Sequence, residues 1–201
     1  MTMVDLGPQT RIVARLAASV ADEQLTAATP CPDLRVRNLL GHLLTLSLAF
    51  RDAARKDLGT RTDTSPAATL PDIGPGWRAR LPEALDELAE AWRDPAAWTG
   101  GTRAGGVDLP GAVAGAVVAG ELVIHAWDLA RATGQAYVPD PDALDAALGF
   151  LRAAADGPAR DGLFGAVVPV PEAAPPLDRA VGLSGRDPAW APGTRPRAAR
   201  A

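Results

Sequence analysis

Apolar residues at helical spacing, interrupted by proline and glycine, constrain the fold of this chain most. No stretch shows the alternation typical of a half-buried strand, and only residues 166–171 suggest one. The helical period predicts an all-α bundle. Its main helices are expected at about residues 9–25, 34–56, 77–92 and 111–133, with a fifth from residue 141 onward.

Local residue chemistry suggests where several of these helices begin and end. Asp33 is a plausible N-cap of the second helix. Pro82 indicates that the regular part of the third helix starts there. Pro110 suits the first turn of the fourth helix and Gly134 its end, while Asp140 and the following proline suit the start of the fifth. The polar segments between helices predict loops, at about residues 57–76 and 94–109.

The C-terminal part of the chain differs from the rest. Residues 167–176 are rich in proline and are expected to lie extended over the core, before one more short helix at residues 177–183. Residues 194–201 predict a disordered tail, because they contain only proline, arginine and alanine after the threonine. We therefore expect one domain over residues 1–193.

Composition excludes several classes of protein. The chain has 201 residues, one cysteine and two histidines, which suits a single domain without disulfide bonds. No signal-peptide pattern opens it, so a cytoplasmic protein is expected. No apolar run approaches the roughly 20 residues of a membrane span, so no membrane partner is expected. A pI near 5.2 argues against nucleic-acid binding.

The fourth predicted helix carries ionisable residues on its apolar face. The stripe that begins with Val117 and Val118 continues through Glu121, His125 and Asp128. A buried carboxylate costs several kcal/mol unless it is paired or bound to a cation. Glu121 and His125 lie one helical turn apart, so a single metal ion can contact both side chains.

His42 supplies the third metal ligand in this interpretation. It lies among the apolar residues of the second predicted helix, so two helices that meet in a bundle would bring it to Glu121 and His125. Three protein ligands leave a position for water or substrate, which is the pattern of catalytic metal sites. Because histidine ligands must be neutral, metal affinity is expected to fall below about pH 6.

Each of these residues also has a plainer interpretation. The histidines can be hydrogen-bonded core residues, and Glu121 with His125 can be a simple helix pair. Asp128 either pairs with Arg131 or orients a histidine ligand from behind. Cys31, between two prolines, is expected to be structural rather than nucleophilic.

Two sequence segments and one turn together form a recognisable motif set. The first segment is Thr29-Pro-Cys-Pro-Asp33 followed by Val36-Arg-Asn-Leu-Leu-Gly-His42. The second runs from Glu121 to Gly134, and the turn is Gly185-Arg-Asp-Pro188. They resemble the DinB-like superfamily, in particular the actinobacterial branch related to the N-terminal domain of mycothiol-dependent maleylpyruvate isomerase. The resemblance covers most of residues 1–190.

This resemblance implies a four-helix up-down-down-up bundle with extra short C-terminal elements. It implies a divalent metal, zinc or alternatively nickel, bound through three ligands at positions His42, Glu121 and His125. Characterised relatives use a low-molecular-weight thiol such as mycothiol. The metal would stabilise its thiolate, which would attack a small-molecule electrophile in an S-transfer or a cis–trans isomerisation. Homodimers are also implied.

The family's isomerase differs from this chain at the C-terminus. It carries a second domain that contributes to its active site, whereas about 45 residues follow the fifth predicted helix here, fewer than a usual domain of at least about 50. We therefore expect a thiol S-transferase rather than maleylpyruvate isomerisation. Two rivals stay open, namely a non-catalytic stress-response module that binds metal or ligand, and a non-haem iron oxygenase with the same two-histidine, one-carboxylate set.

Overall fold

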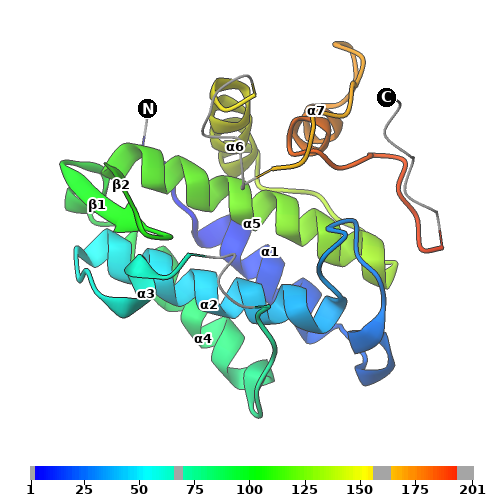
Figure 1. Ribbon diagram of the computed structural model, residues 1–201, viewed down its shortest axis with the longest axis horizontal. Coiled ribbons are helices and arrows are strands. Elements are labelled where there is room, and N and C mark those ends of the chain that lie inside the picture. The colour runs from blue at the N-terminus through cyan, green and yellow to red at the C-terminus, as the bar shows by residue number, and fades with distance from the viewer. Residues whose placement is uncertain (1–2, 66–69, 156–163, 194–201) are drawn as a thin grey trace.

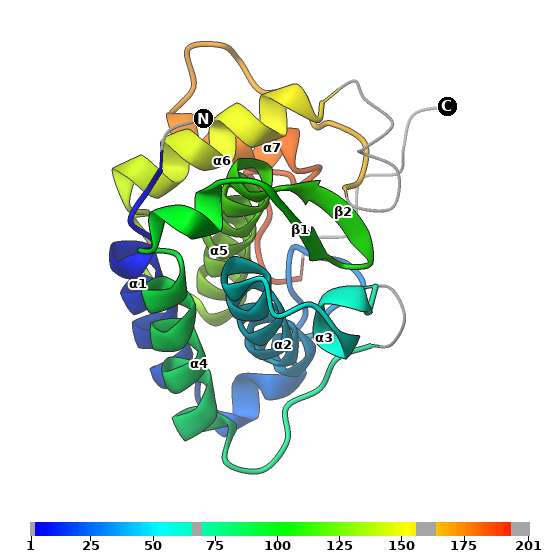
Figure 2. The same ribbon diagram turned by 90° about the vertical axis from the view of Figure 1, so that its left-hand side faces the viewer.

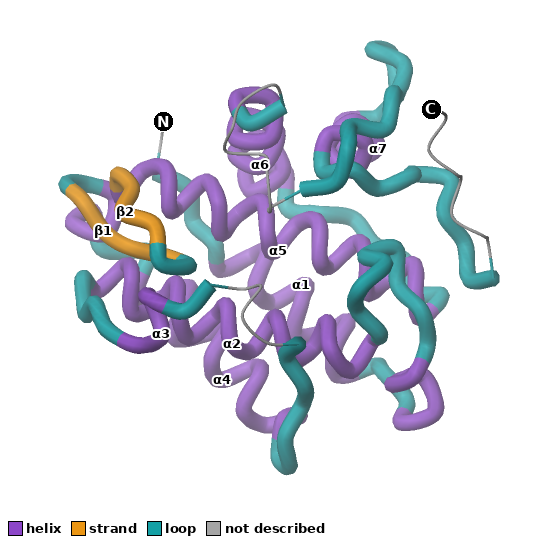
Figure 3. Tube along the Cα trace, viewed as in Figure 1, coloured by secondary structure: helices purple, strands orange, loops and turns teal. Residues whose placement is uncertain are grey.

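The computed structural model describes residues 3–65, 70–155 and 164–193 of a mainly helical protein (Figures 1 and 3). The all-α prediction is confirmed. The predicted tail at residues 194–201 lies outside the described residues. The α-helices are α1 Gly7–Ala18, α2 Val36–Arg55, α3 Thr60–Asp63, α4 Trp77–Ala91, α5 Gly111–Thr133, α6 Pro141–Ala153 and α7 Pro176–Leu183.

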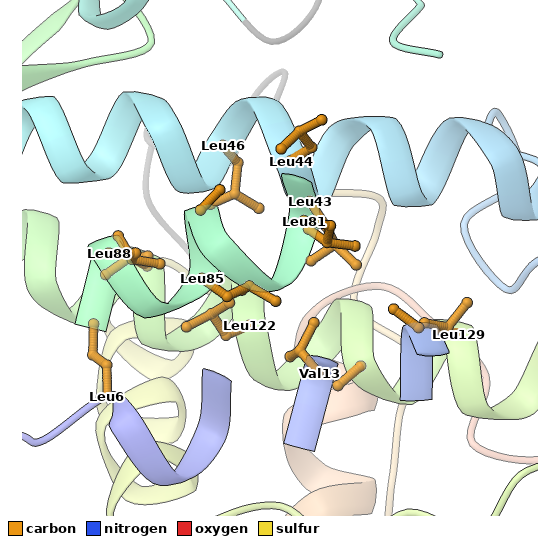
Figure 4. Packing of buried hydrophobic residues seen from close by; sticks show 14 of the residues in the cluster. Leu6, Val13, Leu43, Leu44, Leu46, Leu81, Leu85, Leu88, Leu122 and Leu129 are labelled. Carbon is orange, nitrogen blue, oxygen red and sulfur yellow. The ribbon is translucent and has the colours of Figure 1, made fainter. Parts of the chain in front are cut away.

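Four of the helices close a ring around the main core (Figure 2). Helix α1 packs against α4 and α5, and α2 packs against the same two helices from the other side. Leucines from all four helices meet inside the ring, and Figure 4 shows several of them. A fully buried leucine side chain contributes about 1.5–3 kcal/mol relative to exposure, so this core is the main source of stability. The ring is the bundle that the resemblance implied.

Helix α5 is the central helix of the molecule. It lies in the ring and is also covered on its outer side by α6, against which α7 packs (Figures 1 and 2). By length and composition α5 could cross a membrane, so the statement that no apolar run reaches that length is wrong. Its most apolar window is 78% buried inside the protein, which is the behaviour of a core helix.

The N-terminal helix is shorter than predicted. Helix α1 ends at Ala18, and a separate 3₁₀ helix, η1 Asp22–Thr26, follows it. Gln24 accounts for the new start, because its side-chain oxygen accepts a hydrogen bond from the Ala21 amide at 3.0 Å. Its side-chain nitrogen donates to the Thr133 carbonyl at 3.1 Å, which attaches η1 to the end of α5.

The prediction that Asp33 caps the second helix is wrong. Helix α2 begins at Val36, and Asn38 Oδ1 accepts a hydrogen bond from the Arg35 amide at 3.2 Å in the capping role. The preceding turn is closed by Thr29, whose buried hydroxyl oxygen lies 2.7 Å from the Leu34 carbonyl oxygen. The N-cap of α2 is therefore Arg35, two residues after the expected cap.

The segment predicted as a loop at residues 94–109 contains regular structure. A short 3₁₀ helix, η2 Pro95–Trp98, precedes an antiparallel hairpin of β1 Gly101–Ala104 and β2 Val107–Pro110. Gly105 and Gly106 form its two-residue turn with φ of 61° and 80°, values that a side chain would disfavour.

The strand suggested at residues 166–171 does not form. The Val168 amide in this segment instead donates a hydrogen bond to the Gly182 carbonyl at 3.0 Å.

The remaining helix ends agree closely with the sequence. Helix α5 spans the predicted residues and ends at Gly134 with a φ of 72°, although Pro110 is its N-cap rather than its first residue. Asp140 Oδ1 caps α6 by accepting from the Ala143 amide at 3.0 Å. Helix α4 starts at Trp77 and runs through Pro82, so the expected late start is wrong.

Candidate metal centre

The candidate metal centre lies where α2 and α5 pack against each other. His42 comes from the second turn of α2, and Glu121 and His125 come from successive turns of α5. Residues four apart lie on one face of a helix, so the i, i+4 spacing aims both α5 side chains toward α2. The structure thus brings together the three residues that the sequence singled out, although His42 and Glu121 are 79 positions apart.

The three side chains converge on one carboxylate oxygen. Glu121 Oε2 lies 3.2 Å from His42 Nε2 and 3.1 Å from His125 Nε2. All three ligand atoms lie within 4.8 Å of one another. In a tetrahedral zinc site with bonds of about 2.0 Å, neighbouring ligand atoms are about 3.3 Å apart. The two short distances therefore match edges of such a tetrahedron, and the donor set of two imidazoles and a carboxylate suits zinc.

Exposure differs between the three candidate ligands. The side chain of His125 is 8% exposed, whereas those of His42 and Glu121 are 17% and 22% exposed. The imidazole rings meet edge to face, with centroids 4.7 Å apart. The cluster is therefore more exposed at His42 and Glu121 than at His125.

Asp128 fixes the orientation of His125 from behind. Its Oδ2 lies 2.9 Å from His125 Nδ1, and its side chain has no exposure to solvent. The hydrogen bond leaves His125 Nε2 facing Glu121 and His42, which is the usual role of a carboxylate behind a histidine ligand. The alternative in which Asp128 pairs with Arg131 is wrong, because Arg131 donates to the carbonyls of Pro188 and Trp190 instead.

Arg186 completes the arrangement and was not predicted as a site residue. Its Nη2 and Nε donate to the two carboxylate oxygens of Asp128 at 3.1 and 3.3 Å. The sequence contained a signal, since Arg186 belongs to the Gly-Arg-Asp-Pro turn noted in the resemblance. That turn gave no reason to connect it with Asp128, 58 residues earlier.

The charges of the cluster shift its pKa values strongly. Burial disfavours the charged form of His125, but hydrogen bonds to Asp128 and Glu121 outweigh it and raise its pKa to about 9. Burial likewise opposes ionisation of Glu121, yet the two histidines hold its pKa well below the usual range. Burial opposes ionisation of Asp128 too, and Arg186 and His125 lower its pKa. Without a metal, His125 therefore carries a proton between the carboxylates of Glu121 and Asp128, and a bound cation can replace that proton.

Cys31 lies near this cluster but is not part of it. The sulfur is absent from the group of ligand atoms that converge, among the residues that the structure describes. Burial raises the pKa of the Cys31 thiol to about 11, with Arg186 opposing the shift. The thiol is therefore protonated at neutral pH and a poor nucleophile, which agrees with the structural role expected for it.

Comparison with known proteins places this chain in a family. A family model described as the mycothiol maleylpyruvate isomerase N-terminal domain matches residues 6–130. The chain belongs to this family. The matched part contains His42, Glu121, His125 and Asp128, whereas Arg186 and α7 lie beyond it. The protein is therefore a DinB-like, mycothiol-associated helical domain with a C-terminal extension to the matched region.

Two curated relatives from Mycobacterium tuberculosis cover most of the chain. They are the uncharacterized proteins Rv0738 of strain ATCC 25618 / H37Rv and MT0763 of strain CDC 1551 / Oshkosh. Each is 28% identical over 178 residues, which is 86% of this chain and 91% of the relative. No solved structure gives a significant match.

Proposed function

We propose that His42, Glu121 and His125 bind a divalent metal ion, with zinc favoured and nickel the alternative. The observation that carries the proposal is the convergence of the three ligand atoms within 4.8 Å of one another, with the two distances to Glu121 Oε2 close to the edge of a tetrahedral zinc site. The orientation of His125 by Asp128 supports it, because such outer carboxylates accompany histidine ligands in metal sites.

The proposed activity is a thiol-dependent S-transfer, with mycothiol as the thiol suggested by the family. A divalent cation at this point supplies positive charge that stabilises a thiolate at neutral pH. Glu121 and His42 form the exposed side of the cluster, so both reactants would approach there. In the transfer the thiolate sulfur bonds to an electrophilic carbon, and the leaving group departs with the electrons of the broken bond.

The remaining parts of the proposal concern surroundings and partners. We expect a cytoplasmic protein whose partners are a low-molecular-weight thiol and a small-molecule electrophile, rather than nucleic acid or membrane. The net charge of −4 supports the first exclusion, and the burial of α5 supports the second. The helical scaffold argues against the non-haem iron oxygenase, whose sites typically lie on β-barrels.

Metal analysis of the purified protein tests the metal site. Wild type is expected to contain about one equivalent of metal after dialysis, and His42→Ala and His125→Ala are expected to contain much less, since no other histidine can replace them. Unchanged metal content in both variants would overturn the ligand assignment.

A thiol-consumption assay tests the activity. The metal-loaded protein is mixed with mycothiol and chlorodinitrobenzene or another electrophile with a good leaving group, and loss of free thiol is followed. Consumption that requires both the protein and His42 supports the transferase. Metal binding without consumption across a panel of electrophiles would overturn it in favour of the non-catalytic binding module.

A further inference from the structure

Arg186 makes contacts that only a precisely placed guanidinium can make. Two of its nitrogens donate to Asp128, and Nη1 donates to the Ser184 carbonyl at 3.0 Å. The Arg186 side chain is 10% exposed and that of Asp128 is fully buried. Arginine presents planar donors that match a carboxylate at two points, which a lysine ammonium cannot reproduce.

The backbone turn at the end of α7 places the Arg186 side chain against Asp128. Gly185 follows the helix with a φ of 82°, and a Cβ there would lie 2.9 Å from the backbone of Gly165. The Arg186 amide donates to the Val181 carbonyl at 3.1 Å, which turns the chain back over α5. Both the left-handed backbone and the close approach favour glycine, so another residue at this position would strain the turn.

Arg186 acts on His125 through the position of Asp128. Two parallel donors fix the plane of the Asp128 carboxylate, and a fixed carboxylate in turn fixes the imidazole ring that it contacts. With Arg186 in place, Asp128 Oδ2 is held 2.9 Å from His125 Nδ1, and Nε2 stays directed at Glu121 and His42. The order of contacts is therefore Arg186, Asp128, His125 and then the ion.

We propose that Arg186 is a positioning residue of the metal centre, so that the C-terminal extension is part of a site whose ligands all lie in the family-matched bundle. The inference rests on the proposed metal binding by His42, Glu121 and His125. By linkage, docking of the turn after α7 strengthens metal binding, and bound metal strengthens docking to the same degree.

Arg131 provides a matched control. It holds the same turn by donating to the carbonyls of Trp190 and Pro188 at 2.6 and 3.2 Å, but it does not contact Asp128. Arg131→Met therefore loosens the turn without removing the guanidinium from Asp128. Arg186→Met removes that guanidinium and keeps a side chain of similar length.

Cobalt titration of the full chain tests the proposal without requiring an activity. Co²⁺ takes the same donors as zinc and reports their geometry in its visible absorption bands. Arg186→Met is expected to lower Co²⁺ affinity about 10–100-fold and to alter the bands, as loss of outer-shell partners does. Arg131→Met is expected to stay within about 3-fold of wild type with unchanged bands. Equal affinity for Arg186→Met and wild type, or an equal loss in both variants, would overturn the proposal.

Two further variants keep the test decisive if Arg186→Met does not fold. Arg186→Lys keeps the charge and is expected to recover part of the affinity, while its bands differ from those of wild type. In the Asp128→Asn background, adding Arg186→Lys should lower affinity no further, because Arg186 acts through Asp128. A further loss in the double variant would contradict this route. If the wild-type protein does not bind Co²⁺, the proposed function is wrong. If the wild-type protein binds Co²⁺ and the Arg186 variants bind it equally well, the proposed function stands and only the inference about Arg186 is wrong.

Discussion

The two helices that form the candidate metal centre hold their histidines in different ways. On α2, His42 is 17% exposed and contacts Glu121. On α5, His125 is 8% exposed and is held between Glu121 and Asp128, with Arg186 behind the latter. The side chain of His125 on α5 is therefore held in place without a bound ligand, whereas His42 on α2 is the more exposed of the two histidines. A preorganised half and an accessible half together suit a site that must keep its ion while exchanging small molecules.

Glu121 joins the two halves, and its loss should have the largest effect. Glu121→Gln removes the charge of the one oxygen that contacts both histidines. Zinc affinity is expected to fall by more than about 100-fold, beyond the range for outer-shell groups. Isothermal titration measures it, with Glu83→Gln on the exposed face of α4 as the control. If Glu121→Gln keeps the wild-type zinc affinity, Glu121 does not bind the ion together with His42 and His125.

Loss of Asp128 should affect only the preorganised half. Asp128→Asn removes the charge on His125 Nδ1 and leaves Arg186 buried without its partner. We expect about 10–100-fold weaker zinc binding and a lower melting temperature of the metal-free protein. Asp86→Asn, exposed on α4, is the matched control for titration and thermal unfolding. An unchanged melting temperature and affinity would mean that His125 needs no support from behind.

The pH dependence of metal binding should reflect His125. Because the pKa of His125 is raised to about 9, metal must displace a proton over the whole range below it. Zinc affinity is thus expected to rise by up to about tenfold per pH unit to about pH 9, well above the limit near pH 6 that ordinary histidines suggest. Titrations in buffers of different ionisation enthalpy measure the proton released. A flat affinity between pH 7 and pH 9 would contradict the shift.

The same groups predict how the metal-free protein responds to pH. His125 has a raised pKa, so its stabilising contribution is complete below about pH 6.5 and is lost as pH rises through about 9. Glu121 and Asp128 have lowered pKa values, so their contribution is present above their ordinary values near pH 4 and is lost in acid. Thermal unfolding should show greatest stability between about pH 5 and 6.5. Added zinc should move this maximum to higher pH.

Cys31 should give the smallest effect of the series. Its sulfur is outside the converging ligand atoms, and burial keeps the thiol protonated. Cys31→Ser is therefore expected to change zinc affinity by less than about 2-fold, and alkylation of the wild-type thiol should be slow near neutral pH. Titration and mass spectrometry check both. A large loss of affinity would add a fourth residue to the open side.

Several local features could be predicted from the sequence alone. The helical period located α2, α4 and α5, and Gly134 and Asp140 marked helix ends that the structure confirms. The hairpin was missed, although the Gly-Gly pair at its turn is a recognised signal, because its strands are too short to show alternation. The cap of α2 was misplaced because Thr29 closes the turn before the helix and Asn38 accepts from the Arg35 amide, so Asp33 takes no part in capping.

By itself, the sequence determined the helices and the candidate ligands. Periodicity and i, i+4 spacing are local properties, and with two histidines in the chain the ligand set had few alternatives. That His42, Glu121 and His125 bind metal stays a prediction. Only the tertiary structure decided which partner Asp128 takes, because Arg131 and Arg186 were equally suited by charge. The packing of α6 on α5 and of α7 on α6 brings Arg186 to the buried carboxylate, while Arg131 contacts backbone carbonyls, and no local pattern encodes that choice.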